Sequence, residues 1–479
     1  MLSTKRTKIV CTIGPASGDA QKLLALVNAG MNVCRLNFSH GTHADHAALI
    51  QRIREIREQT GEPLAILQDL QGPKIRVGDL PKEGVKLEIG KRIIFTTGAA
   101  DIPEKLPVTY PRLHEDAKVG QTILLDDGLL SVKVTAVQGN DVICDVVNGG
   151  VLTSHKGMNL PETKTMISAL SEKDREDVKF GVGQGVDWIA LSFVRSAEDI
   201  RELRALIQSE TQAQKIADET PIRIIAKIEK PEAIEHFDEI LDAVDGIMVA
   251  RGDLGIEIAA ERVPILQKEI IRKCLDAAKP VVVATQMLDS MIRQPRATRA
   301  EISDVANAVI DHADATMLSG ETASGAFPID AVRTMASTIQ EAEKSAYDDL
   351  PLRIREDVNT EEAMTNVASA LIQAHRAKAI VVASLSGHAA RLVSRYRTEI
   401  PIYAATPSER VKYQLNLSWG IKPFHLPSCA TIAELASQSI AYLLKQKFVQ
   451  SGDEVILVAG EPLGASGFVN LVEVKKVGS

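Results

Sequence analysis

One pattern restricts the fold of this chain more than any other feature: a short apolar run followed by a helical stretch, repeated along most of its length. Such repeats are typical of parallel strands that are covered by helices. Three repeats precede residue 72 and five lie between residues 187 and 321; their apolar runs read TKIVCTIG, NVCRLNFS, LAILQDL, DWIALSF, RIIAKIE, GIMVARG, PVVVAT and ATMLSGE. Eight such units predict a closed (β/α)8 TIM barrel, with a doubly wound open sheet as the alternative.

The repeat is interrupted between residues 74 and 168, where short β-type runs alternate with glycine turns and no long helical period appears. This pattern predicts an all-β insertion of about 95 residues, a small β-barrel in the loop after the third strand. Loops at that end of a TIM barrel form the mouth of the active site, so the insertion is placed to act as a lid. The helical period returns at Ser171, where Asp174 completes a capping box.

Beyond about residue 348 a polar link, DDLPLRIREDVNT, leads to five more apolar runs with helical stretches between most of them. They predict a separate α/β domain. The expected organisation is a catalytic barrel in residues 1–71 and 169–346, an inserted β-barrel lid in residues 72–168, and a C-terminal α/β regulatory domain in residues 347–479.

Composition and charge exclude several classes of protein. The formal net charge of −8 offers no general face for a polyanion, so nucleic acid is not expected as a partner. The five cysteines are far apart and form no CxxC motif, which predicts reduced, mostly buried thiols rather than disulfides or zinc ligands. No signal-peptide pattern and no long apolar run is present, so we expect a cytoplasmic protein without a membrane partner.

Polar side chains gather at the ends of the apolar runs, and in a TIM barrel these ends point into the active site. The residues are Arg35, Asn37, Ser39, Asp69, Ser192, Lys227, Glu229, Arg251, Asp253, Thr285, Ser319 and Glu321. Ordinary structural explanations exist for single members: Asp253 could cap the next helix, and Lys227 could simply pair with Glu229. They do not explain why almost every strand ends this way, so we predict an active site.

The chemistry of these side chains indicates an anionic substrate and a metal. Glu229 and Asp253 are hard oxygen donors on adjacent strand ends, which suits Mg²⁺. Arg35 and Lys227 are cations that suit a phosphorylated substrate bearing a carboxylate. Gly252 would let a ligand approach the backbone closely. Arg251 is expected instead to pair with a neighbouring carboxylate and orient the loop.

Two further cations lie at the ends of the insertion. Arg76 follows its first connection to the barrel, and Lys156 lies in SHKGMNL near the second. If the lid closes, both could reach the phosphates of a second substrate; otherwise they are solvated loop charges.

Several long motifs, in one order along nearly the whole chain, resemble the pyruvate kinase family, in its bacterial type. They include TKIVCTIGPAS, MNVCRLNFSHG, DLQGPKIR, HKGMNLP, AKIEKPEAI, GIMVARGDLGIEI, PRATRAEISDVANAV and MLSGETASGAFP. The resemblance implies transfer of a phosphoryl group from phosphoenolpyruvate to ADP, giving pyruvate and ATP, the final step of glycolysis. It also implies the same order of domains and a homotetramer.

The resemblance further implies roles for the residues at the barrel mouth. Arg35 would contact the phosphate of phosphoenolpyruvate, and Lys227 would stabilise charge on the phosphoryl group in transfer. Glu229 and Asp253 would hold Mg²⁺ or Mn²⁺. The backbone at Gly252 and Asp253, with the Thr285 hydroxyl, would contact the substrate carboxylate; Thr285 and Ser319 are candidates for relaying a proton to the enolate through water; Arg76 and Lys156 would contact nucleotide phosphates.

One departure from the family pattern concerns potassium. Members that need K⁺ usually carry glutamate where this chain has Lys74, in GPKIR. The matches of the usual K⁺ ligands, Asn37, Ser39, Asp69 and the Leu70 carbonyl, are still present, so a K⁺ site stays open. Our hypothesis is that the Lys74 ammonium replaces the missing monovalent cation.

The C-terminal domain contains SLSGHAARL, a strand-to-helix turn in which Ser384, Ser386 and Gly387 suit a phosphate. The family uses this place for sugar-phosphate effectors, but Leu385 and Ala389 stand where fructose-1,6-bisphosphate-regulated members can have polar residues. A sugar phosphate or nucleotide effector is therefore expected without a fixed identity, and a plain helix N-cap is the alternative.

Two other functions compete with this one. A Mg²⁺-dependent aldolase or lyase of pyruvate would need no nucleotide, and Arg76, Lys156 and the lid argue against it. A catalytically silent barrel that senses metabolites through its last domain would not need Lys227, Glu229, Asp253 and Thr285, which are all present.

Overall fold

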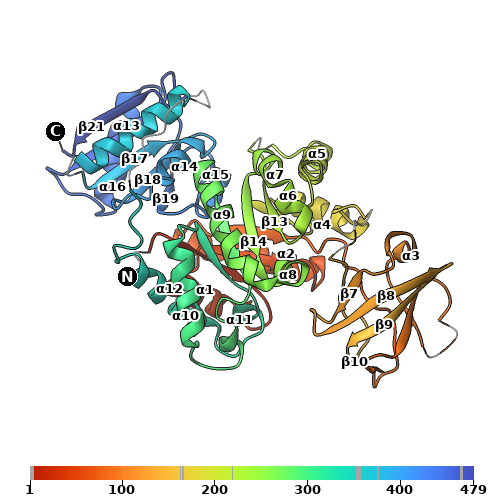
Figure 1. Cartoon of the computed structure of the whole chain (residues 1–479). Coiled ribbons are helices and arrows are strands. Elements are labelled where there is room, and N and C mark those ends of the chain that lie inside the picture. Colours follow the sequence, from red (N-terminus) through yellow and green to blue (C-terminus); the bar gives the residue numbers. More distant parts are fainter. Residues whose placement is uncertain are drawn as a thin grey trace.

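The computed structural model describes residues 5–478 apart from 101, 103, 162, 164–166, 218–219, 352–357, 375–376 and 464–467. In this described part, eight parallel strands form a closed barrel in the order β1-β16-β15-β14-β13-β12-β3-β2 (Figure 1). The strands are β1 (Lys8–Thr12), β2 (Val33–Asn37), β3 (Ala65–Asp69), β12 (Trp188–Leu191), β13 (Arg223–Ile228), β14 (Gly246–Ala250), β15 (Val281–Ala284) and β16 (Ala315–Leu318). The predicted barrel is confirmed, and the open sheet is excluded.

Helices surround the barrel, and their apolar faces pack with the outward-facing strand residues into one large core. They are α1 (Ala20–Ala29), α2 (His43–Thr60), α4 (Glu172–Gly183), α5 (Ala197–Ala213), α6 (Pro231–Glu235), α7 (Phe237–Ala243), α8 (Arg251–Glu257), α9 (Val263–Asp276), α10 (Arg299–Ile310), α11 (Gly320–Ala323) and α12 (Pro328–Ala342). The capping box predicted at Ser171 and Asp174 is present at the start of α4. Because the barrel strands are buried on both faces, their apolar runs are continuous rather than alternating.

The insertion after β3 is an all-β unit with one short helix, and its apolar residues form a core of their own. Its described strands form a six-stranded sheet, β11-β7-β8-β9-β5-β6, and a two-stranded sheet, β10-β4, around that core. The elements are β4 (Val85–Leu87), β5 (Arg92–Thr96), β6 (Lys105–Pro107), α3 (Leu113–Asp116), β7 (Thr122–Leu125), β8 (Leu130–Gln138), β9 (Asp141–Asn148), β10 (Gly150–Leu152) and β11 (Met158–Asn159).

The C-terminal domain is an α/β layer structure, as predicted. Within the described residues its sheet has the order β19-β18-β17-β20-β21, with only β21 antiparallel to its neighbour. The elements are α13 (Thr360–Ala374), β17 (Ala379–Ala383), α14 (His388–Ser394), β18 (Ile402–Thr406), α15 (Glu409–Leu415), β19 (Ile421–His425), α16 (Ile432–Lys445), β20 (Glu454–Ala459) and β21 (Leu471–Lys476). Residues 352–357 of the predicted polar link lie outside the described residues.

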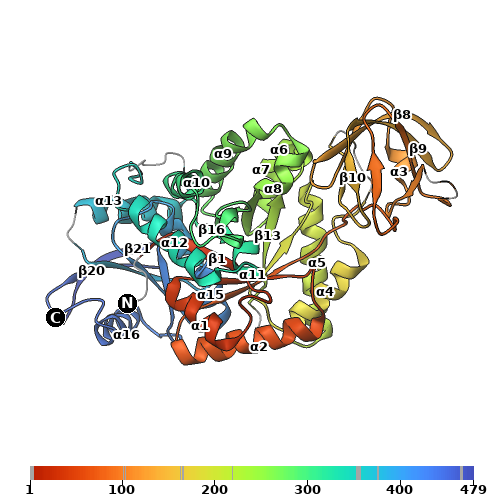
Figure 2. The same cartoon turned by 90° about the horizontal axis from the view of Figure 1, so that it is seen from below.

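The insertion and the C-terminal domain lie on opposite sides of the barrel (Figures 1 and 2). The C-terminal domain covers the end where the barrel strands begin: Leu417 belongs to the same buried cluster as the residues inside the barrel. Lys8 Nζ, at the start of β1, donates to the Ile421 carbonyl over 2.7 Å. The opposite end of the barrel, where the strands stop, is therefore left to the insertion.

Two further expectations concern cysteines and membranes. Cys11, Cys34, Cys144 and Cys274 are buried free cysteines and Cys429 is partly buried, which confirms mostly buried thiols. Among the helices in the described ranges, none is long and apolar enough to cross a membrane.

The contact between the barrel and the C-terminal domain contains a buried carboxyl group, Asp348, with Arg6 Nη2 at 3.9 Å and His312 Nδ1 at 3.7 Å. Burial, and then the charge of Glu343, raises the pKa of Asp348 to about 7. This pKa lies above the value of about 3.9 in an unfolded chain, so the folded state loses stability as the pH rises through 7.

We therefore expect Asp348→Asn to unfold at a temperature a few degrees above that of the parent protein at pH 8. The difference should shrink as the pH falls towards 4, where the parent carboxyl is protonated in the folded state. Thermal unfolding followed by circular dichroism measures both, with the exposed neighbour in Asp349→Asn as the matched control. An Asp348→Asn protein less stable than its parent at pH 8 would show that the contact with Arg6 outweighs the cost of burial.

Candidate active site

Four charged side chains meet at the mouth of the barrel, where the strands end. Arg35, on β2, lies with its Nε 2.6 Å from Oδ2 of Asp69, the last residue of β3. Lys227, on β13, lies with its Nζ 3.4 Å from Asp69 Oδ1 and 2.8 Å from Glu229 Oε1. All four residues are buried. The structure thus brings together side chains that the sequence placed at the ends of three different strands.

Neighbouring charges in this cluster shift pKa values, and the shifts determine the charge state of Lys227 and Asp69. Burial alone would lower the pKa of Lys227, but Asp69 and Glu229 raise it above its usual value, so Lys227 is a cation. Burial would raise the pKa of Asp69, but Lys227 and Arg35 lower it, so Asp69 is a carboxylate. Burial, with a contribution from Asp253, raises the pKa of Glu229 despite the attraction of Lys227.

Glu229 is the member of this cluster that fits a metal ion. Its Oε2 accepts a hydrogen bond from the Phe193 amide over 2.8 Å, whereas its buried Oε1 has no hydrogen-bond partner within the described residues and only the Lys227 ion pair. A further cation would offset the electrostatic cost of keeping this carboxylate charged. The charge of Asp253, in the first turn of α8, raises the pKa of both Glu229 and Lys227. Two such carboxylates fit Mg²⁺.

Two hydroxyl groups complete this cluster. Ser192, just after β12, accepts from Lys227 Nζ over 2.7 Å and donates to the Leu70 carbonyl over 2.8 Å. Thr12, the last residue of β1, accepts from Arg35 Nη1 over 2.8 Å. The sequence pointed to Ser192 without a role and did not single out Thr12, although Thr12 also ends an apolar run. Both hydroxyls orient the cations.

Arg251 turns away from the mouth and fixes the position of α8. It forms two bonds of 2.7 Å with the carboxylate of Asp304 on α10, and it donates to the Thr285 carbonyl over 2.8 Å. The expectation that Arg251 pairs with a neighbouring carboxylate is confirmed. Asp253 lies in the first turn of the helix, where a negative charge is favourable, and the N-cap residue Ala250 makes no side-chain hydrogen bond to the helix.

Thr285 lies against the start of the same helix. The Gly252 amide donates to Thr285 Oγ1 over 2.7 Å, and a Cβ at residue 252 would lie only 3.3 Å from that oxygen. Thr285 and Gln286 have φ values of 69° and 54°, a left-handed conformation that costs energy for residues other than glycine. Such strain is common where a backbone is shaped for a ligand.

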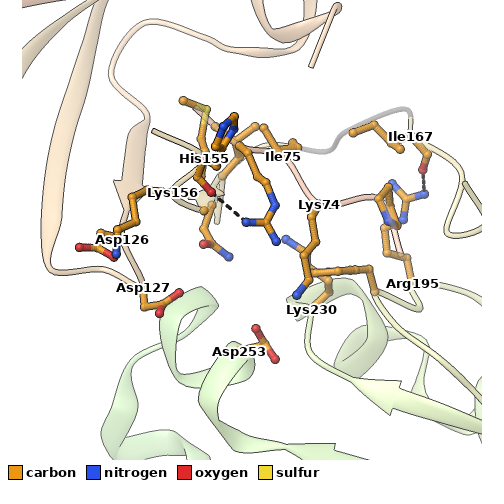
Figure 3. A pocket seen from close by; sticks show the side chains of 17 residues that line it. Lys74, Ile75, Asp126, Asp127, His155, Lys156, Ile167, Arg195, Lys230 and Asp253 are labelled. Atoms are coloured by element: carbon orange, nitrogen blue, oxygen red, sulfur yellow. Dashed lines mark hydrogen bonds and ion pairs between the residues drawn. The ribbon is translucent and has the colours of Figure 1, made fainter. Parts of the chain in front are cut away.

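A cavity of about 300 Å³ lies between the insertion and the barrel mouth (Figure 3). Its cationic lining residues are Lys74, Arg76, Lys156, Arg195 and Lys230, and its carboxylates are Asp126, Asp127 and Asp253. Lys156 pairs with Asp126 over 2.7 Å, and Arg76 Nη1 donates to the His155 carbonyl over 2.8 Å. The cavity therefore places Arg76 and Lys156 in one space with Asp253.

Of the other predicted residues, Lys74 lines this cavity, and the rest lie outside it. The Ser319 amide donates to Glu321 Oε2 over 2.7 Å, at the end of β16. Asn37 Oδ1 accepts from the Ser39 amide over 3.1 Å. Desolvation, and then the charge of Lys227, lowers the pKa of Lys74. In the C-terminal domain, Ser384 and Ser386 line a cavity of about 140 Å³ beside Gly387, the N-cap of α14.

Comparisons with known proteins match almost the whole chain. The family model described as pyruvate kinase, barrel domain, matches residues 4–332, and the one described as pyruvate kinase, alpha/beta domain, matches residues 362–475. A pyruvate kinase of Geobacillus stearothermophilus is 45% identical over 98% of this chain and 80% of its own length. One of Clostridium acetobutylicum is 42% identical over 99% of this chain and 100% of its own length.

A solved structure gives the same result. The crystal structure of a pyruvate kinase from Cryptosporidium parvum is 37% identical, has a TM-score of 0.91, and covers 99% of this chain and 96% of that one. The closed barrel and these relatives define an enzyme of the phosphotransferase class. More narrowly, the chain belongs to the pyruvate kinase family, in its bacterial type, and its function is that of a pyruvate kinase.

Proposed function

We propose that the cluster at the barrel mouth transfers the phosphoryl group of phosphoenolpyruvate to ADP, giving pyruvate and ATP. Arg35 binds the phosphate of phosphoenolpyruvate, and Lys227 stabilises charge on the phosphoryl group as it moves. The observation that carries this proposal is the position of Lys227, a buried cation held between Asp69 and Glu229 at 3.4 and 2.8 Å. Phosphoryl transfer needs positioned positive charge more than covalent chemistry from the protein.

Glu229 and Asp253 are the proposed ligands of a divalent ion, Mg²⁺ or Mn²⁺. The buried Glu229 oxygen without a hydrogen bond supports this assignment. A divalent ion in this position supplies charge neutralisation for the phosphoryl group and the enolate oxygen. Lys227, whose Nζ lies 2.8 Å from Glu229 Oε1, would remain beside this carboxylate when the ion is bound.

The substrate carboxylate is assigned to the backbone amides of Gly252 and Asp253 and to the Thr285 hydroxyl. The Gly252 amide donates to Thr285 Oγ1 over 2.7 Å, so the two groups are adjacent. The Thr285 hydroxyl itself donates to the Ala284 carbonyl over 2.6 Å, so a bound carboxylate would have to replace these internal hydrogen bonds. After transfer the enolate needs a proton, and Thr285 and Ser319 are our candidates for relaying it through water.

ADP is proposed to bind in the cavity under the insertion, with its phosphates on Arg76 and Lys156. The cations that line this cavity, and Asp253 beside them, support the assignment. Closure of the insertion over the mouth would exclude water, which competes with ADP for the phosphoryl group.

The decisive experiment is a coupled assay of pyruvate formation with phosphoenolpyruvate, ADP and Mg²⁺. We expect turnover that requires all three, with ATP formed in equal amount. Pyruvate formed at the same rate without ADP would instead indicate a phosphatase, which transfers the phosphoryl group to water. No turnover would indicate a silent barrel or an aldolase or lyase that acts on another substrate.

Potassium is proposed to be dispensable because the Lys74 ammonium replaces it. Lys74 lines the same cavity as Asp253. Burial, and then the charge of Lys227, lowers the pKa of Lys74. We expect turnover in a K⁺-free tetramethylammonium buffer to stay within about twofold of that with K⁺, since a tethered ammonium needs no exchangeable ion. A collapse of activity in that buffer would return the K⁺ site to Asn37, Ser39, Asp69 and the Leu70 carbonyl.

Regulation and assembly are proposed from the family alone and from one cavity. The cavity beside Ser384, Ser386 and Gly387 is the proposed site of a phosphorylated effector, a sugar phosphate or a nucleotide. The assembled enzyme is proposed to be a homotetramer.

A further inference from the structure

A buried carboxylate, Glu257, connects the insertion to the active-site helix. Glu257 is the last residue of α8, and its side chain is 1% exposed. Its Oε1 accepts one hydrogen bond from Lys230 Nζ over 2.6 Å and another from Asn159 Nδ2 over 2.8 Å. Asn159 ends β11, the last strand of the insertion, and Lys230 directly follows Glu229. One carboxylate therefore joins three segments that are distant in the sequence.

Lys230 extends this chain of contacts to the other end of the insertion. Its Nζ lies 5.7 Å from the ring centroid of Phe193. The Phe193 amide is the donor to Glu229 Oε2. The ring of Phe193 also lies against Gly72, where a Cβ would come within 2.6 Å of the ring, so no larger residue fits without movement. Gly72 begins the first connection to the insertion.

The same residues line the cavity assigned above to ADP. Phe193, Lys230 and Asn159 belong to its lining together with Arg76 and Lys156. Figure 3 shows Lys230, Lys74 and Arg195 on one side of the cavity and Asp126 on the other. Glu257 therefore contacts one connecting segment of the insertion, residues 157–161, directly through Asn159. It reaches the other, residues 72–77, through Lys230 and the Phe193 ring that lies against Gly72.

We infer that Glu257 is a positioning residue that holds the insertion on α8 through Lys230 and Asn159, and so sets the geometry in which ADP meets the barrel mouth. This inference rests on the proposed roles of Arg76 and Lys156 in binding ADP. Within the described residues, Glu257 Oε2 has no hydrogen-bond partner, so both hydrogen bonds that stabilise the carboxylate are made to Oε1. Loss of Lys230 or of the negative charge then loosens both connecting segments.

The first test measures the connecting segments without any catalysis. Glu257→Gln keeps an acceptor for Asn159 but removes the charge that attracts Lys230. We expect hydrogen–deuterium exchange in peptides covering residues 72–77 and 157–161 to become about tenfold faster, and exchange in β8 and β9 to stay unchanged. Glu362→Gln, which removes an ion pair of 2.8 Å with Arg395 in the C-terminal domain, is the control and should leave these peptides unchanged.

The second test separates the two substrates. We expect Glu257→Gln to raise the KM for ADP about tenfold and to change the KM for phosphoenolpyruvate less than twofold, since only ADP contacts the insertion. Lys230→Gln should have the same effect, and the double variant should be no worse than either single variant, because the pair acts as one unit. If Glu257→Gln does not fold, both measurements can be made on Lys230→Gln alone. The Lys230 side chain is 20% exposed, so its replacement disturbs the fold less.

Unchanged exchange in the two connecting segments would overturn the inference, as would additive effects in the double variant or equal rises in both KM values. A parent protein that turns over no phosphoenolpyruvate with ADP would refute the proposed function instead. In that case the exchange measurement still decides whether Glu257 holds the insertion.

Discussion

Replacing Lys227 by methionine is expected to lower kcat by about 10³- to 10⁵-fold, the range in which a single cation stabilises phosphoryl transfer. Methionine preserves the length and apolar stem of the side chain but removes the amine that lies between Asp69 and Glu229. Because this amine acts on charge that develops in the transition state, the loss should appear in kcat, with the KM for phosphoenolpyruvate changed much less. Steady-state kinetics by the coupled assay measure both.

Stability must be measured beside activity, because the substitution leaves two buried carboxylates with one cation fewer. Asp69 keeps its bond to Arg35 over 2.6 Å, so we expect the fold to survive with a lower unfolding temperature. Lys173→Met is the matched control: Lys173 pairs with Asp177 on the outside of the barrel over 2.6 Å. A Lys227→Met protein whose kcat stays within tenfold of the parent value would remove Lys227 from its proposed role.

The barrel could be predicted because its signal is repetitive and local. Each strand is buried on both faces, so each appears in the sequence as a continuous apolar run, and eight runs with helices between them leave few alternatives. The polar residues at the strand ends could be predicted for the same reason. Lys227 and Glu229, two residues apart at the end of one strand, are the clearest case.

The partners of these residues could not be predicted, because they depend on packing between distant segments. Arg251 meets Asp304, which lies 53 positions further along the chain. Glu257 meets Asn159 across 98 positions, and it lies in the segment GDLGIEI, where it reads as one more charge on a short helix. Only the closed barrel, with the insertion packed on it, brings these residues together, so sequence spacing contains no sign of the contacts.

The second large effect is expected for Glu229→Gln, which tests the proposed metal ligands. Glutamine preserves an oxygen for the Phe193 amide but has no negative charge, so one of the two proposed metal ligands is weakened without a change of volume. We expect the Mg²⁺ concentration for half-maximal activity to rise at least about tenfold and kcat to fall about 10²- to 10³-fold. Titration of Mn²⁺ by electron paramagnetic resonance gives the affinity directly, without reliance on turnover.

The matched control is Glu321→Gln, a buried carboxylate at the end of the eighth strand that accepts from the Ser319 and Leu288 amides. Since no metal is assigned to Glu321, its variant should bind Mn²⁺ with the parent affinity. If Glu229→Gln also bound Mn²⁺ with the parent affinity, the ion would have to lie on other ligands. Glu229 would then keep only its contacts with Lys227 and the Phe193 amide among the described residues, and burial together with the charge of Asp253 would account for the raised pKa of its carboxyl.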